Sequence, residues 1–206
     1  MQKNTKTGSA RPSSAREKSR FWLKMLCACA IMTALSVVLD GYLSIPVGGG
    51  IKFTFGFVPP AVIGMLYGPL PSAIVFGLAD LTAVAVGITV GTYHPGFTIC
   101  NLLMGLCFGL CLHPNPFYSS KKPPCTLLSL PRRIAGVAIS TLFNNVVCGL
   151  LLNTLWVSML YGSRTYYGWF LYRLPQYAVM IPLYIVLLLL LSRLAPMFFK
   201  MGFGKR

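Results

Sequence analysis

Long apolar stretches recur along this chain, and they contain almost no charged residues. A helix needs about 20 apolar residues to cross the hydrocarbon core of a bilayer. Charged residues make up only 10% of the chain, against about 25% in typical soluble domains, and the mean hydropathy is +0.69. These features predict an all-α integral membrane protein, a bundle of six transmembrane helices over 21–43, 53–68, 69–88, 97–112, 132–161 and 168–195.

The two ends of the chain are basic, and the N-terminal end is also poor in apolar residues. We expect residues 1–20 to form a disordered cytoplasmic tail, because this segment lacks the apolar side chains that a core requires. Residues 21–196 are predicted to form the membrane domain, and 197–206 a second basic tail. The apolar run 21–43 is longer than the roughly 7–15 residues of a signal peptide's apolar region, so it is predicted to be an uncleaved helix.

The positive charges are distributed unevenly along the chain. A net charge of +15 would suit nucleic acid if it were spread over a soluble surface. Instead, most of the basic residues fall within 1–24, 121–133 and 193–206, whereas the segments on the opposite side hold Lys52 and Arg164. Because cytoplasmic loops are enriched in lysine and arginine, both termini are predicted to be cytoplasmic. The charge then requires no nucleic-acid partner.

Polar side chains interrupt the apolar segments, mostly in their outer halves. Each costs free energy in hydrocarbon unless it faces a partner or a cavity. We therefore expect a pocket reached from outside. Its candidate polar ligand-binding residues are Lys52, Asp80, Asn101, Asn145, Asn153, Arg173 and Gln176. The aromatic residues expected around it are Tyr93, His94, Phe97, Trp156 and Tyr172. Alternatively, Asp80 only pairs with Arg173, and the asparagines only hold helices together.

Helical spacing predicts which of these residues share a face. Arg173, Gln176 and Tyr177 are related as i, i+3 and i+4, and Asn145 and Trp156 are three helical turns apart. Aromatic rings beside amides, an acid and an arginine suit a flat heteroaromatic ligand that carries a carboxylate, since arginine can bind a carboxylate with two parallel hydrogen bonds.

Catalytic residues are scarce in this sequence. Its acidic residues are Glu17, Asp40 and Asp80, and its histidines are His94 and His113, so no catalytic triad, paired-aspartate site or HExxH metal motif can be assembled. A phosphate-binding GxxxxGK[ST] loop is also absent from the sequence. The chain is predicted not to be an enzyme, to use no cofactor and not to hydrolyse ATP itself.

Cysteines and small residues give two weaker signals. Cys107 and Cys111 stand one helical turn apart and could share a metal, but no histidine or acid lies at a suitable spacing, so packing is favoured and no metal site or disulfide is predicted. Small residues four apart allow another helix to approach closely. The pairs Ala30/Ala34 and Ala79/Ala83 are candidates for a surface that docks a partner subunit; contact within the bundle is the alternative.

Several blocks of the sequence resemble one family. The runs IKFTFGFVPPAVIGMLYGPLPSAIVFGLADL, YHPGFTICNLLMGLCFGL and LLNTLWVSMLYG resemble the substrate-binding S component of energy-coupling factor (ECF) vitamin transporters, and most closely the folate-specific FolT family. The resemblance implies the six-helix S-component fold in the bacterial cytoplasmic membrane, with a vitamin bound near the outer face. It also implies docking through helices 1 to 3 onto a transmembrane coupling subunit that two cytoplasmic ATPases drive. The loop 43–51 would be the lid.

The resemblance to folate proteins suggests roles for the candidate residues. Asp80 or an asparagine of the fifth helix would bind the pterin edge, Trp156, Phe97 or Tyr93 would stack on a ring, and Arg173 or Lys52 would bind the glutamate carboxylate. Two alternatives remain open from the sequence: an S component for riboflavin, thiamine, pantothenate or a queuosine precursor, or a membrane enzyme or channel.

Overall fold

The computed structural model describes residues 13–48, 51–88, 93–113, 130–162 and 165–198, and these ranges are helical apart from one two-stranded hairpin. The elements in chain order are α1 (Ser13–Tyr42), β1 (Ile45–Gly48), β2 (Ile51–Phe53), α2 (Val58–Tyr67), α3 (Pro69–Ala85), α4 (Pro95–Leu112), α6 (Leu130–Leu142), the π-helix η1 (Phe143–Leu152), α7 (Asn153–Tyr161) and α8 (Tyr166–Phe198).

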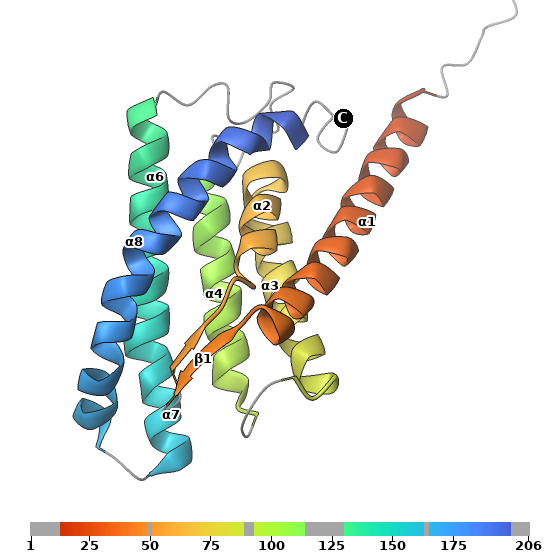
Figure 1. Cartoon of the computed structure of the whole chain (residues 1–206). Helices are drawn as coiled ribbons and strands as arrows, with labels where there is room; N and C mark the ends of the chain where they lie inside the picture. The colour runs from red at the N-terminus through yellow and green to blue at the C-terminus, as the bar shows by residue number, and fades with distance from the viewer. Residues whose placement is uncertain (1–12, 49–50, 89–92, 114–129, 163–164, 199–206) are drawn as a thin grey trace, which may run out of the picture.

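The segments α1, α2, α3, α4, α6 to α7, and α8 run in alternating directions (Figure 1). The start of α1, the start of α6 and the end of α8 lie at one end of the bundle, at the top of the figure. The hairpin and the ends of α3 and α7 lie toward the other end. Because α6, η1 and α7 follow one another without a break, they form a single long helical segment.

Within the described residues, four helical segments are long and apolar enough to cross a membrane: Ser19–Tyr42, Pro95–Leu112, Pro131–Leu160 and Tyr166–Leu194. They correspond to the first, fourth, fifth and sixth predicted spans. The second and third predicted spans are the shorter apolar helices α2 and α3, with 10 and 17 residues. The count of six spans therefore remains a prediction.

The junction of α2 and α3 is a sharp turn at Gly68. Gly68 ends α2 with a φ of 97°, which a residue with a side chain rarely adopts, and its backbone N–H donates to the carbonyl of Gly64. Pro69 then opens α3, at a position where its missing N–H removes no helical hydrogen bond. The chain reverses within two residues, so α2 ends and α3 begins at the same level of the bundle.

Two local features differ from the sequence expectations. Helix α1 begins at Ser13, inside the segment 1–20 expected to be a disordered tail, because Ala15, Arg16 and Glu17 are good helix formers that extend the apolar helix. Residues 1–12 and 199–206 lie outside the described residues. The loop expected over 43–51 contains strand β1 and the first residue of β2; the two strands are antiparallel, and Ile45 faces Phe53.

The interior is a cluster of apolar side chains from α2, α3, α4, α6 and α8. Phe57, Phe76 and Phe108 belong to this cluster, with ring centroids of Phe76 and Phe108 6.2 Å apart. Helices α3 and α4 approach closely at Gly105, where a Cβ atom would lie 2.6 Å from the Cα atom of Ala73. The bundle's outer surface is largely apolar, as expected of helices that face lipid.

Candidate ligand-binding pocket

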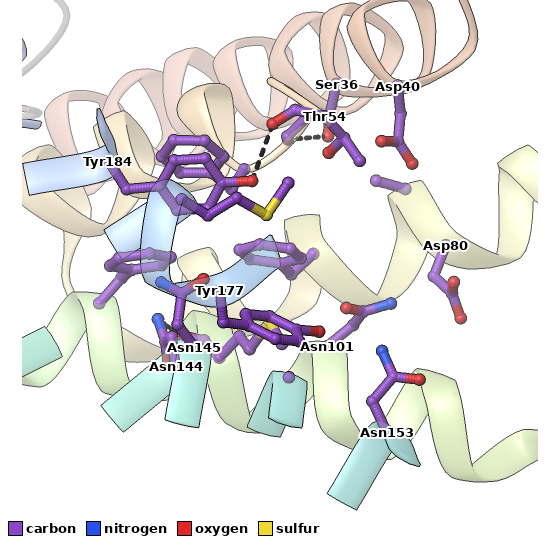
Figure 2. Close-up of a pocket in the computed structure, with 18 of the residues that line it drawn as sticks. Ser36, Asp40, Thr54, Asp80, Asn101, Asn144, Asn145, Asn153, Tyr177 and Tyr184 are labelled. Carbon is purple, nitrogen blue, oxygen red and sulfur yellow. Dashed lines mark hydrogen bonds between the residues drawn. The ribbon is translucent and has the colours of Figure 1, made fainter. Parts of the chain in front are cut away.

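A cavity of about 300 Å³ lies between the helices, in the half of the bundle that carries the hairpin. Its wall is built from α1, the β2–α2 connection, α3, α4, η1, α7 and α8. Pockets for small molecules typically have volumes of about 300–1,000 Å³. Figure 2 shows that polar side chains from helices far apart in the sequence point toward this space.

Most of the polar residues proposed from the sequence lie in this wall: Asp80, Asn101, Asn145, Asn153, Arg173 and Gln176. They come from α3, α4, η1, α7 and α8, so only the folded bundle brings them together. The spacing argument for α8 matches this placement, because Arg173, Gln176 and Tyr177 all line the cavity. Lys52 lies in β2, opposite Pro46, and its side chain is outside the described part of the structure.

The aromatic residues Tyr93, His94, Phe97 and Trp156 are not part of the cavity wall. His94 caps the start of α4 by accepting a hydrogen bond from the backbone N–H of Gly96 at 3.1 Å, and its ring stacks on Trp156 with centroids 5.0 Å apart. Phe97 packs edge-on against His94. These side chains tie the start of α4 to α7 beside the pocket, and Tyr172 packs against Trp169 instead.

The π-helix explains why Asn145 lines the cavity while Trp156 does not. The predicted common face assumed regular α-helical geometry, but residues 143–152 form a π-helix with a wider turn. Its inward positions are Asn144, Asn145 and Gly149, followed by Asn153 at the start of α7. Gly149 is required for packing, because a Cβ atom there would lie 2.7 Å from the Tyr177 ring.

A different aromatic set lines the cavity, and Tyr177 is its one member that the helical spacing already indicated. The set consists of Phe57, Phe76 and Phe108 from the apolar core, with Tyr177 and Tyr184 from α8. The rings of Phe57 and Tyr184 lie 4.0 Å apart. Tyr184 follows Tyr177 by seven residues, so it lies on the same helical face. This seven-residue spacing is the feature of the sequence that indicates Tyr184 as a pocket residue.

The charged groups of the pocket come from two sides. Asp40 at the end of α1 and Asp80 in α3 line one part of the wall (Figure 2), whereas Arg173 comes from α8. Neither α1 nor α3 has an extensive contact with α8. Asp80 accepts a hydrogen bond from Thr98 at 2.6 Å and, among the described residues, makes no ion pair with Arg173.

Arg173 has unused hydrogen-bonding capacity. Its Nη1 atom is buried and has no hydrogen-bond partner among the described residues. A buried donor without a partner costs free energy, more so when it is charged. A carboxylate on a bound molecule would satisfy it, so the pocket can bind an anionic group beside α8.

Comparison with known proteins agrees with this fold. A sequence model of the ECF transporter substrate-specific component matches residues 24–192. The chain belongs to this family. It is therefore the S component of an ECF transporter, a membrane transport protein whose family is not one of enzymes.

Two relatives extend the comparison. The folate transporter FolT of Clostridium novyi (strain NT) is 31% identical over 161 residues, which cover 77% of this S component and 82% of the relative. A crystal structure of FolT bound with folic acid superimposes with a TM-score of 0.66 at 24% identity, and the match covers 82% of this chain and 93% of that chain. The second comparison shows that the two proteins share a fold.

Proposed function

We propose that this S component captures folate from outside the cell and delivers it inward. It would act with a transmembrane coupling subunit and two cytoplasmic ATPases in the bacterial cytoplasmic membrane. The relative from Clostridium novyi is a folate transporter, and the similar solved structure holds folic acid, which supports folate as the ligand. The chain supplies no phosphate-binding loop of its own.

The separation of charges in the pocket carries this proposal. Folate has hydrogen-bond donors on its pterin ring and carboxylates on its glutamate, at opposite ends of the molecule. Asp80 from α3 suits the donors, and the unpartnered Nη1 of Arg173 from α8 suits a carboxylate. A ligand without a carboxylate would leave that buried charge unpaired.

Aromatic and amide groups complement the charged ends. Phe57, Phe76 and Tyr184 provide flat apolar surface against which a pterin or benzoate ring can pack. Asn101, Asn144 and Asn145 add amides that can either donate or accept. The ring-stacking role first assigned to Tyr93, Phe97 or Trp156 therefore passes, in this proposal, to the aromatic residues of the cavity wall.

The topology we propose has six spans with both ends in the cytoplasm. Helices α2 and α3 would complete the four longer spans, and their short lengths suit a location beside a cavity, where irregular backbone is tolerated in a membrane. The positive-inside rule then puts the segments rich in lysine and arginine in the cytoplasm. The pocket and the hairpin would face outward.

For docking onto the coupling subunit, we propose the exposed face of α1. Ala30 and Ala34 lie on that face beside the exposed side chain of Ile31. Ala79 and Ala83 are only 7% and 3% exposed, so contact within the bundle accounts for them and they are not available to a partner.

Ligand identity is testable on the purified protein. Native mass spectrometry in detergent, followed by calorimetric titration with folate, riboflavin, thiamine and pantothenate, should give one tight site for folate alone. Tight binding of another vitamin would keep the family and reject folate. Binding of none of them would reject the pocket as a site for these vitamins.

A further inference from the structure

A chain of hydroxyl groups leads from outside the cavity to Asp80. Thr98 Oγ1 donates to Asp80 Oδ2 at 2.6 Å, and the hydroxyl of Tyr93 lies 3.0 Å from Thr98 Oγ1. A threonine hydroxyl has one proton, which here is used by the Asp80 carboxylate. Tyr93 must therefore be the donor to Thr98, so both hydroxyls point their protons toward Asp80.

Thr98 does not line the cavity, although Asp80 does. It lies in the first turn of α4, which His94 anchors through its cap to Gly96 and its stack on Trp156. Threonine is branched at Cβ and has restricted χ1 rotation. Thr98 is thus a fixed donor, held by α4 and α7, that reaches a carboxylate on α3.

The short distance indicates a charge-assisted bond, because hydroxyl–carboxylate hydrogen bonds of this kind measure about 2.5–2.7 Å. Such a bond fixes the orientation of the Asp80 carboxyl group. A carboxylate accepts hydrogen bonds at about four positions on its two oxygens, and in Asp80 the side chains of Thr98 and Asn101 occupy two of them. The carboxyl group of Asp80 points toward Asn153 in Figure 2. Its remaining acceptor positions are available to a ligand.

We propose that Thr98, supported by Tyr93, is a positioning residue that sets the ligand specificity of the pocket through Asp80. Held in this way, Asp80 selects a heteroaromatic ring that presents adjacent N–H donors, such as the 2-amino and ring N–H groups of a 2-amino-4-oxopyrimidine edge. A ring with a carbonyl oxygen in place of the amino group is rejected, because two acceptors would face each other. This inference rests on the proposed folate function.

The test compares two ligands on the full-length protein in detergent. Folic acid and an analogue with an oxo group in place of the 2-amino group are each titrated into the protein, and their dissociation constants are compared. Thr98→Val removes the hydroxyl with little change in shape, Thr98→Ser keeps it, and Tyr93→Phe removes the second donor. Thr82→Val is the matched control. Thr82 lies two residues from Asp80, but its hydrogen bonds in the described part of the chain stay within its own helix, to the carbonyls of Leu78 and Ala79.

We expect Thr98→Val to weaken the binding of folic acid about tenfold, since a hydrogen bond to a charged group contributes substantially to affinity. Binding of the oxo analogue should weaken much less. The ratio of the two dissociation constants should therefore narrow. Thr98→Ser should keep the wild-type ratio, and Thr82→Val should leave the ratio unchanged. Tyr93→Phe should narrow the ratio about threefold, because it weakens the same chain of hydrogen bonds.

An unchanged ratio in Thr98→Val, or an equal loss for both ligands, would overturn the inference and leave Thr98 a packing role. Because Tyr93 is partly exposed, Tyr93→Phe keeps the inference testable if Thr98→Val does not fold. If the wild-type protein binds neither ligand, the proposed function is wrong and this inference falls with it. Wild-type binding with no change in ratio rejects the inference alone.

Discussion

Tyr184 in the last helix donates a hydrogen bond to the backbone carbonyl of Thr54, 130 residues earlier in the chain, at 3.0 Å. On the other side of the same segment, the hydroxyl of Ser36 in α1 donates to the carbonyl of Gly56. Figure 2 shows both bonds at the edge of the pocket. The connection between the hairpin and α2 is thus held from two helices that do not adjoin each other.

We expect Tyr184→Phe to accelerate ligand release. The substitution removes the bond to Thr54 but keeps the ring that packs on Phe57, so the pocket keeps its shape while the hairpin connection loses one attachment. A neutral hydrogen bond contributes about 0.5–1.5 kcal/mol, which predicts a dissociation rate about two- to tenfold higher. Stopped-flow measurement of folate release would test this. Tyr167→Phe, at an exposed position of the same helix, is the control, and equal rates in the two variants would contradict the prediction.

Arg173→Gln should weaken folate binding about 10- to 100-fold, because hydrogen bonds to charged groups contribute about 1.5–3 kcal/mol. Pterin without the glutamate should lose little affinity, since it has no carboxylate for Arg173 to bind. Calorimetric titration of both ligands measures the difference. Arg193→Gln, near the far end of α8, should behave like the wild-type protein. Equal losses for the two ligands would show that Arg173 does not bind the carboxylate.

Gly105→Val should destabilise the bundle. The new side chain would collide with the backbone of Ser72 and Ala73, where a Cβ atom alone already lies 2.6–2.8 Å from three atoms. Overpacking of this kind costs about 1–3 kcal/mol. The midpoint of thermal unfolding in detergent should fall by several degrees. Ala135→Val, on an exposed position of α6, is the matched control. An unchanged midpoint in Gly105→Val would mean that α3 and α4 are not in close contact.

Ala34→Phe should impair assembly with the coupling subunit while leaving folate affinity unchanged. Ala34 is exposed on α1, away from the cavity wall, so a bulky ring there obstructs a partner and not the pocket. Co-purification of the coupling subunit and ATPases measures the effect. Ile139→Phe, also exposed but on α6, should assemble normally. Normal assembly of Ala34→Phe would reject this face of α1 as the docking surface.

The sequence predicted the helices well because their apolar length is set by the bilayer and their ends by proline and glycine. It also grouped Arg173, Gln176 and Tyr177 correctly, since α8 keeps regular α-helical spacing over these residues. The prediction that Asn145 and Trp156 share a face is wrong, because α-helical spacing does not hold across the π-helix between them.

Two further features needed the folded chain. The strands β1 and β2 are short, and the glycines between them suggested only a loop, although Ile45, Val47 and Ile51 favour strands. The pairs Ala30/Ala34 and Ala79/Ala83 look alike in sequence, yet the first is exposed and the second buried. Which small-residue pair faces a neighbouring helix depends on the tertiary packing of α1 against α3.

Uptake of labelled folate into proteoliposomes would test the account most directly. The vesicles should contain this S component with the coupling subunit and ATPases of the same organism. The account predicts accumulation that requires ATP, saturates with folate and falls sharply with Arg173→Gln. If the assembled complex hydrolyses ATP but no folate enters, or if folate enters without the ATPases, this S component does not capture folate for an ECF transporter.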